Sequence, residues 1–135
     1  MLNRRSKAKV RGFTIIELMV VISIILILIS VAAPIFTQSI LRAREAVLRQ
    51  NLFAMRTSID SFSIDKGRAP QSLDDLVQSG YLREIPVDPM TNSRDSWEVV
   101  QEDVLLSIDQ EQPGITDVHS GAPGAGSDGT AYSEW

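Results

Sequence analysis

The strongest pattern along the chain is a long apolar run near its start. From Leu18 to Ala33, sixteen residues carry no charge, and eleven of them are Leu, Ile or Val. Counted from Phe13 the run has 21 residues, and as a helix it would extend about 30 Å, the thickness of the hydrocarbon core of a bilayer. The pattern therefore predicts one membrane-spanning helix.

An amphipathic pattern follows the apolar run. Large apolar residues recur at helical spacing between Leu41 and Phe62, with polar residues between them. We therefore expect one helix from Phe13 to about Asp65, with a kink or local melting at Pro34, because proline lacks an N–H and crowds the preceding turn. The apolar stripe consists of Leu41, Leu48, Leu52, Met55, Ile59 and Phe62, and the positions expected off it are Arg42, Arg44, Glu45, Arg49, Gln50 and Arg56.

Shorter signals after residue 66 predict a small α+β head. Ser72 before Asp74 and Asp75 is an N-cap signal, and Gly80 should end a short helix at residues 73–79. Alternating patterns predict antiparallel strands at 97–101, 104–108 and 115–119. A head of about 70 residues is near the lower limit for independent stability, so it should pack on the long helix. The expected core consists of Leu52, Met55, Ile59, Phe62, Leu73, Leu76, Val77, Tyr81, Leu82, Ile85, Val99 and Leu106.

Charge is distributed unevenly along the chain. Residues 1–12 contain five Lys or Arg and no acid, so the positive-inside rule predicts that this leader stays in the cytoplasm and that the head lies across the membrane. The rest of the chain has 17 Asp and Glu against eight Lys and Arg. This acidic balance argues against a nucleic-acid partner, because phosphates require a basic face. With no cysteine, no disulfide can staple the head.

Glu17 is the one charged residue inside the apolar run. An ionised side chain in hydrocarbon is expensive, so such an acid is by default a functional-site hypothesis that requires a partner. Two ordinary alternatives exist for residues 1–33: a secretory signal peptide cut near Ala33, and an uncleaved signal anchor. The length of the run, the acid within it and Pro34 directly after it disfavour the signal peptide.

The start of the run resembles a known processing signal. Residues 12–21, Gly-Phe-Thr-Ile-Ile-Glu-Leu-Met-Val-Val, are similar to the class III signal of type IV pilins and of the pseudopilins of type II secretion systems. The resemblance implies that prepilin peptidase cuts between Gly12 and Phe13 and that Phe13 is then N-methylated. It also implies a partner for Glu17: the amine of Phe13 in a neighbouring subunit, which would neutralise the acid in lipid.

The head narrows the resemblance to the major, G-type pseudopilin, on the residues at 65–70, 73–76, 80–82 and 85–89. That family commonly folds its last loop around one calcium ion, and the candidate ligands here are Asp117, Ser120 and Asp128. Calcium prefers six to eight oxygens, and the Gly-rich run at 121–129 supplies only one acid. We therefore expect a loop held by its own packing. His119 has no second His or Cys at ligand spacing and is expected on the surface.

The sequence thus predicts a structural filament subunit and no enzyme, since no serine has a base placed to activate it. The expected parts are a cleaved leader (1–12), a transmembrane half-helix (13–34), an amphipathic half-helix (35–66) and a periplasmic head (67–135). The resemblance implies partners in copies of the chain, other pseudopilins, prepilin peptidase and an inner-membrane assembly platform. The alternatives are a type IV pilus pilin or minor pilin, and a membrane-anchored binding module that does not polymerise.

Overall fold

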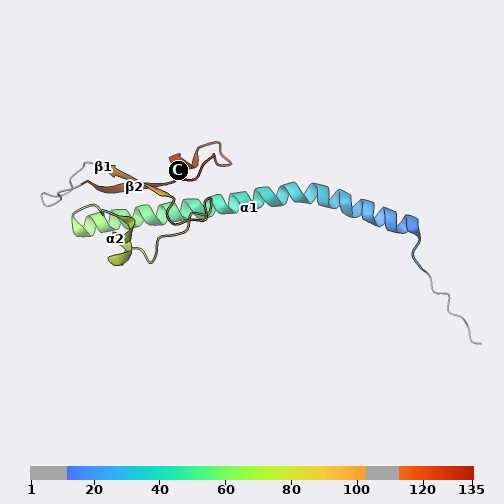
Figure 1. The fold of residues 1–135 in the computed structure, drawn as a ribbon, viewed down its shortest axis with the longest axis horizontal. Helices are drawn as coiled ribbons and strands as arrows, with labels where there is room; N and C mark the ends of the chain where they lie inside the picture. The colour runs from blue at the N-terminus through green and yellow to red at the C-terminus, as the bar shows by residue number, and fades with distance from the viewer. Residues whose placement is uncertain (1–11, 103–112) are drawn as a thin grey trace, which may run out of the picture. The chain divides into compact units, whose positions relative to one another are not determined.

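The computed structural model describes residues 12–102 and 113–135. Along the chain it contains α1 (Ile15–Lys66), α2 (Leu73–Gln78), β1 (Trp97–Glu102), β2 (Gly114–Ser120) and the short 3-10 helix η1 (Tyr132–Glu134), as Figure 1 shows. The chain divides into two compact units, one ending at Ser39 and the other running from Ile40 to Trp135. The predicted α+β class, with a long first helix and a small head, is confirmed.

The long helix forms close to the predicted limits. α1 has 52 residues and passes through Pro34 without a break in helical structure, so the expected local melting is not found. The backbone around Pro34 gains a local side-chain bond, because the Thr37 hydroxyl donates to the Pro34 carbonyl at 3.0 Å. Ser23 and Ser30 likewise donate to carbonyls of their own helix. These hydroxyl groups are therefore satisfied within the helix, as a lipid environment requires.

The short helix is confirmed together with its cap. The Ser72 hydroxyl accepts a bond from the Asp75 amide at 3.2 Å, and the Asp75 carboxylate accepts one from the Ser72 amide at 3.2 Å, which completes a capping box. After α2, Gly80 has a φ of +79°, a conformation that side chains with a Cβ rarely adopt. These local signals explain why α2 could be predicted from the sequence.

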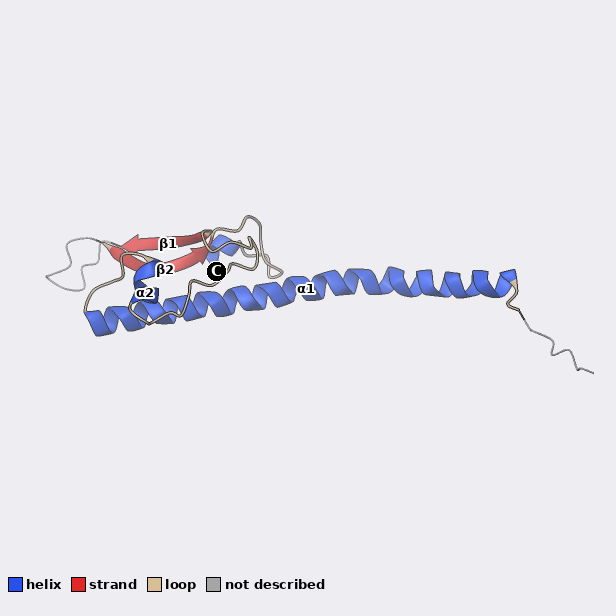
Figure 2. Cartoon of the chain, turned by 60° about the horizontal axis from the view of Figure 1, so that its bottom comes forward, coloured by secondary structure: helices blue, strands red, loops and turns tan. Residues whose placement is uncertain are grey.

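The head contains an antiparallel pair of strands. β1 pairs with β2 from Trp97 opposite Ser120 to Glu102 opposite Gly114, with a register shift between Val100 and Gln101. Figure 2 shows this pair beside the second half of α1. The loop that follows β2 lies along the same half of the helix. The predicted strands at 97–101 and 115–119 are confirmed, and the predicted strand at 104–108 lies outside the described residues.

The core of the head forms between α1, α2 and the sheet. Most of the predicted core positions are buried or pack on the buried cluster, but Val99 is 39% exposed and that prediction is wrong. In β1 only Trp97 faces the core, and its indole N–H donates to the Pro86 carbonyl at 2.8 Å. Leu106 lies outside the described residues. The buried cluster consists of Leu48, Leu52, Met55, Ile59, Phe62, Leu76, Trp97, Ile115, Val118, Ala122 and Tyr132.

Candidate processing and assembly site

The start of α1 is capped by its own sequence. The Thr14 hydroxyl accepts a hydrogen bond of 3.2 Å from the Glu17 amide, and α1 begins at the next residue, Ile15. Glu17 therefore lies in the first helical turn, where the positive end of the helix dipole favours a carboxylate. The Thr-x-x-Glu spacing is a sequence signal for this cap, and our reading of the sequence missed it.

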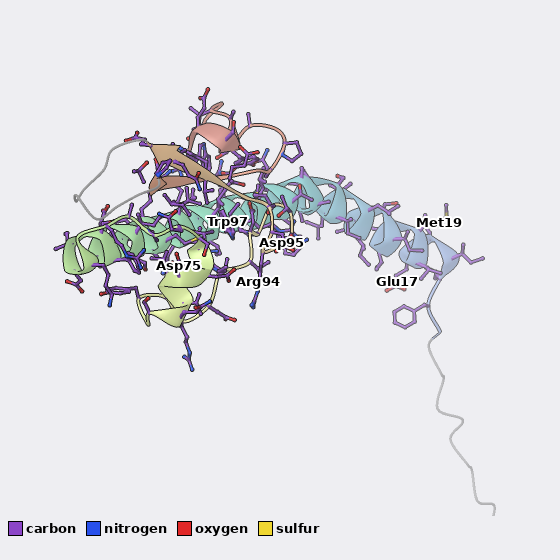
Figure 3. All side chains as sticks on the ribbon, turned by 60° about the vertical axis from the view of Figure 1, so that its left-hand side comes forward. Glu17, Met19, Asp75, Arg94, Asp95 and Trp97 are labelled. Atoms are coloured by element: carbon purple, nitrogen blue, oxygen red, sulfur yellow. The ribbon has the colours of Figure 1, made fainter. Side chains whose placement is uncertain are left out.

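Glu17 is surrounded by exposed apolar side chains. Every residue from 12 to 39 is exposed in the single chain, including Phe13 at 88%. Figure 3 shows the side chains of Glu17 and Met19 leaving the first turns of α1 in different directions. Among the described residues, α1 is the helix long and apolar enough to cross a membrane, and none of its most apolar window is buried. Burial of such a surface requires lipid or other helices.

The three residues predicted for processing and assembly lie together at this end of the helix. Gly12 and Phe13 directly precede the capping residue Thr14, and Glu17 follows it by one turn. A Cβ added at Gly12 would meet no atom within 4 Å, and its φ is not in the left-handed region. The fold therefore places no demand of its own for glycine at position 12.

A second polar site lies on the other half of α1, where Glu45 contacts the loop at residues 121–135. Glu45 is only 5% exposed. Its carboxylate accepts bonds from the Ser127 amide at 2.8 Å, the Ser127 hydroxyl at 2.5 Å and the Tyr132 hydroxyl at 3.1 Å. The bond from the Ser127 hydroxyl is the main reason that the pKa of Glu45 lies below its ordinary value. Glu45 was expected off the apolar stripe, and the structure corrects this: it is buried.

One helical turn along, Arg49 contacts the same loop. Its guanidinium lies 2.6 Å from the Asp128 carboxylate and stacks over the Trp135 ring, 4.2 Å from the centroid. The Thr130 hydroxyl donates to Asp128 at 2.7 Å, which lowers the pKa of Asp128, and Arg49 lowers it further. Burial, followed by the bond to Glu45, raises the pKa of Tyr132.

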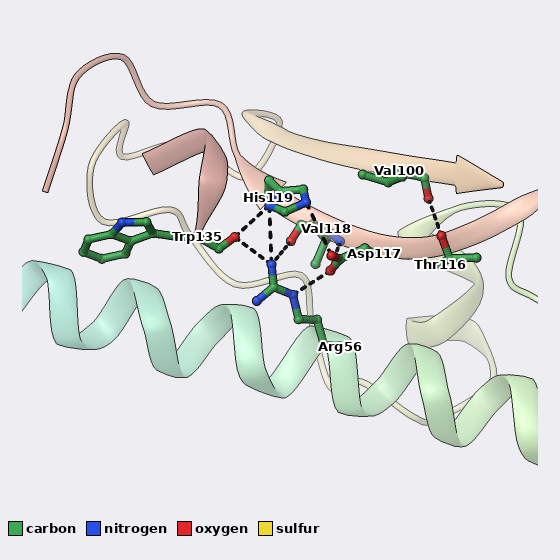
Figure 4. A network of polar contacts seen from close by, with 7 residues as sticks. All are labelled: Arg56, Val100, Thr116, Asp117, Val118, His119 and Trp135. Atoms are coloured by element: carbon green, nitrogen blue, oxygen red, sulfur yellow. Dashed lines mark hydrogen bonds and ion pairs between the residues drawn. The ribbon is translucent and has the colours of Figure 1, made fainter. Parts of the chain in front are cut away.

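Arg56 makes the third contact, shown in Figure 4. Its guanidinium donates to the Asp117 carboxylate at 2.6 Å, to the Val118 carbonyl at 2.9 Å and to the main-chain oxygen of Trp135 at 2.6 Å. His119 Nδ1 lies 2.7 Å from the same Trp135 oxygen and 3.4 Å from the Arg56 guanidinium. His119 was expected on the surface, but it is half-buried inside this network. We call Glu45, Arg49 and Arg56 the loop clasp.

The candidate calcium ligands each have a protein partner. Asp117 pairs with Arg56, and Asp128 pairs with Arg49. Ser120 is fully buried and donates to the Asp88 carboxylate at 2.5 Å. Within the two described ranges, no three His, Cys, Asp or Glu residues gather in a way that could hold a metal. The structure therefore does not bring the three candidates together into one ligand set.

Comparison with known proteins agrees with this architecture. Residues 7–33 match the family described as the prokaryotic N-terminal methylation motif. Type II secretion system core protein G of Escherichia coli K12 is 30% identical over 104 residues, covering 65% of this chain and 72% of that protein. Competence protein ComGC of Halalkalibacterium halodurans is 35% identical over 71 residues, covering 53% and 70%. No match was found among solved structures.

A third relative is the type IV major pilin protein PilA of Myxococcus xanthus, 35% identical over 89 residues, covering 66% of this chain and 36% of that protein. Three features together define a pilin-like, membrane-anchored protein with one spanning helix. They are the apolar helix with one acid in its capped first turn, the small α+β head and the similarity to these relatives. The chain belongs to the prepilin-type family that includes type II secretion system core protein G. It is a pseudopilin, a structural protein that assembles with other pseudopilins into a pilus-like filament.

Proposed function

We propose that this chain is the major subunit of a type II secretion pseudopilus, a periplasmic filament that drives protein export across the outer membrane. One observation carries the proposal: the exposed, apolar first half of α1 is capped by Thr14 and carries Glu17 in its first turn, within a segment that matches the N-terminal methylation motif. Several relatives named type II secretion system core protein G match more than half of this chain.

The first step of the proposed function is processing by prepilin peptidase. The enzyme cuts the bond between Gly12 and Phe13 and methylates the new amine of Phe13. The exposed Phe13 and the open space around Gly12 fit a protease that must approach the backbone closely. The five basic residues of the leader keep it in the cytoplasm before the cut, so the head lies in the periplasm.

The second step is assembly from the inner membrane. Glu17 pairs with the Phe13 amine of a neighbouring subunit, so that docking neutralises both charges. An unpaired carboxylate costs roughly 2.5–3.5 kcal/mol at the centre of a bilayer and less near its edge, which gives the pairing a driving force. The Thr14 cap supports this role because it fixes the first turn that carries Glu17. Other pseudopilins and an inner-membrane assembly platform are the remaining partners.

The similarity to PilA favours one second candidate, a pilin of a type IV pilus. Deletion of the gene from its own organism separates the two. If the chain builds a secretion pseudopilus, the deletion strain retains secreted proteins in the periplasm, and a plasmid copy restores their export. Normal export together with loss of surface pili would contradict the secretion role and favour the pilus.

A further inference from the structure

We propose that the loop clasp fastens the loop at residues 121–135 to α1, and that the residues present do not fit the calcium ion that the G-type resemblance implies. The inference goes beyond the proposed function, because it concerns how this head completes its fold. It holds whether the filament serves secretion or a pilus.

The loop contains little regular structure beyond the short η1. Its internal backbone bonds are short-range turns, such as those of the Gly126 amide to the Thr130 carbonyl at 2.8 Å and of the Gly129 amide to the Gly126 carbonyl at 2.9 Å. Most of its residues are exposed. A 15-residue segment with so little regular structure requires an outside anchor to pay its ordering entropy.

Glu45 supplies that anchor. The loop groups that surround its carboxylate are hydrogen-bond donors, which have the wrong polarity to bind a cation. A calcium site needs six to eight oxygens turned toward one point. Here the Ser127 amide, the Ser127 hydroxyl and the Tyr132 hydroxyl turn their hydrogens toward one carboxylate. Donors gathered in this way stabilise an anion and repel a cation, so the centre of the contact is built for Glu45.

Two arginines of α1 pair with the two carboxylates that were candidate calcium ligands. Arg56 lies 2.6 Å from Asp117, and Arg49 lies 2.6 Å from Asp128. A calcium ion at either carboxylate would have to displace a guanidinium and would then lie beside its positive charge. The chemistry of these residues therefore does not fit a calcium ion.

Side chains within the loop also pack against one another. A Cβ at Gly126 would lie 2.2 Å from the Trp135 ring, whose edge meets the Tyr132 ring with centroids 5.1 Å apart. The Trp135 indole N–H donates to the Thr130 hydroxyl at 2.5 Å. Aromatic packing and the loop clasp together hold the loop without a metal.

Hydrogen exchange of the full chain in detergent micelles tests the proposal. The amides of residues 121–135 should exchange at the same rate in millimolar calcium chloride and in excess EDTA. Glu45→Gln should accelerate their exchange about tenfold in both buffers, because it removes a charge-assisted anchor and turns an amide toward donors. Glu102→Gln, a matched change at an exposed position at the far end of β1, should leave the loop at the wild-type rate.

Two results would overturn the proposal. Slower exchange of the wild-type loop in calcium than in EDTA would show that the ion has a site after all. Equal loop exchange in Glu45→Gln and wild type would show that Glu45 is not the anchor. The calcium comparison uses the wild-type chain, so it remains decisive even if Glu45→Gln folds poorly.

Discussion

The carboxylate of Glu45 accepts a 2.5 Å hydrogen bond from the hydroxyl of Ser127, which lies 82 residues further along the chain. The bond joins α1 to the last loop of the head. A contact of this sequence separation closes a long loop, which costs chain entropy. We therefore expect changes in the loop clasp to weaken the docking of residues 121–135 on α1.

Acid should weaken this contact. The pKa of Glu45 lies below its ordinary value of 4.5, so its contribution to stability is complete above that pH and is lost as the pH falls through the lowered pKa. Glu45→Gln should therefore unfold at a lower temperature than wild type at neutral pH. The difference between them should shrink as the pH drops below 4.5.

Thermal unfolding of the full chain followed by circular dichroism measures that difference. Asp128, whose pKa is also lowered, titrates in both proteins, and in the wild type its charge opposes the lowering of the Glu45 pKa. Tyr132, whose pKa is raised, stays neutral across this range. A difference that stays constant or grows on acidification would show that the Glu45 charge does not stabilise the loop.

Arg56→Met should destabilise the head. The substitution leaves Asp117 and the Val118 and Trp135 oxygens without their guanidinium donor. Because bonds to charged groups are worth about 1.5–3 kcal/mol, and this side chain is partly solvated, we expect a loss of about 1–3 kcal/mol in the free energy of unfolding. Urea titration followed by tryptophan fluorescence measures the loss.

Arg83→Met is the matched control for that experiment. Arg83 is exposed and has no ion pair within the described part of the chain. Its replacement should change the free energy of unfolding by no more than about 0.5 kcal/mol. Equal losses in the two variants would mean that the Arg56 network adds nothing beyond a surface charge.

Glu17→Gln should separate processing from assembly. The Thr14 cap uses the Glu17 amide and not its carboxylate, so the helix start, membrane insertion and the cut before Phe13 should be preserved. Filament yield, measured by crosslinking and sedimentation, should fall at least about tenfold, since the neighbour's amine loses its charged partner. Ser30→Ala serves as a control because the Ser30 hydroxyl donates to the Ile27 carbonyl of its own helix. Wild-type filament yield from Glu17→Gln would remove the pairing role.

Changes at Gly12 should act on the peptidase and not on the fold. A Cβ at this position meets no atom within 4 Å, so both Gly12→Ala and Gly12→Leu should insert and fold normally. Gly12→Ala should slow the cut only modestly, whereas the bulk of Gly12→Leu should block it, as read from the uncleaved fraction on a gel. Normal maturation of Gly12→Leu would place the cut elsewhere.

Local signals were enough to predict most of the fold. Helix α2 follows from the Ser72 cap and Gly80, and α1 follows from its apolar periodicity. The Thr14 cap was available as a Thr-x-x-Glu pattern. The prediction that Val99 lies in the core was wrong because the alternation of apolar and polar residues does not reveal that only Trp97 of β1 faces the core.

The loop clasp could not be predicted in the same way, because its partners lie 61 to 87 residues apart in sequence. One signal does exist. Glu45 falls four residues after Leu41 and three before Leu48, at a position where the apolar stripe should continue. An acid on a buried face requires donors from elsewhere in the chain, and that requirement points to the polar loop at residues 121–135.

The intact mass of the protein extracted from membranes tests the central claim most directly. If the chain is a processed pseudopilin, its mass corresponds to residues 13–135 plus one methyl group. A mass showing no cleavage, or cleavage near Ala33, would contradict the claim and leave a plain anchor or a secreted protein.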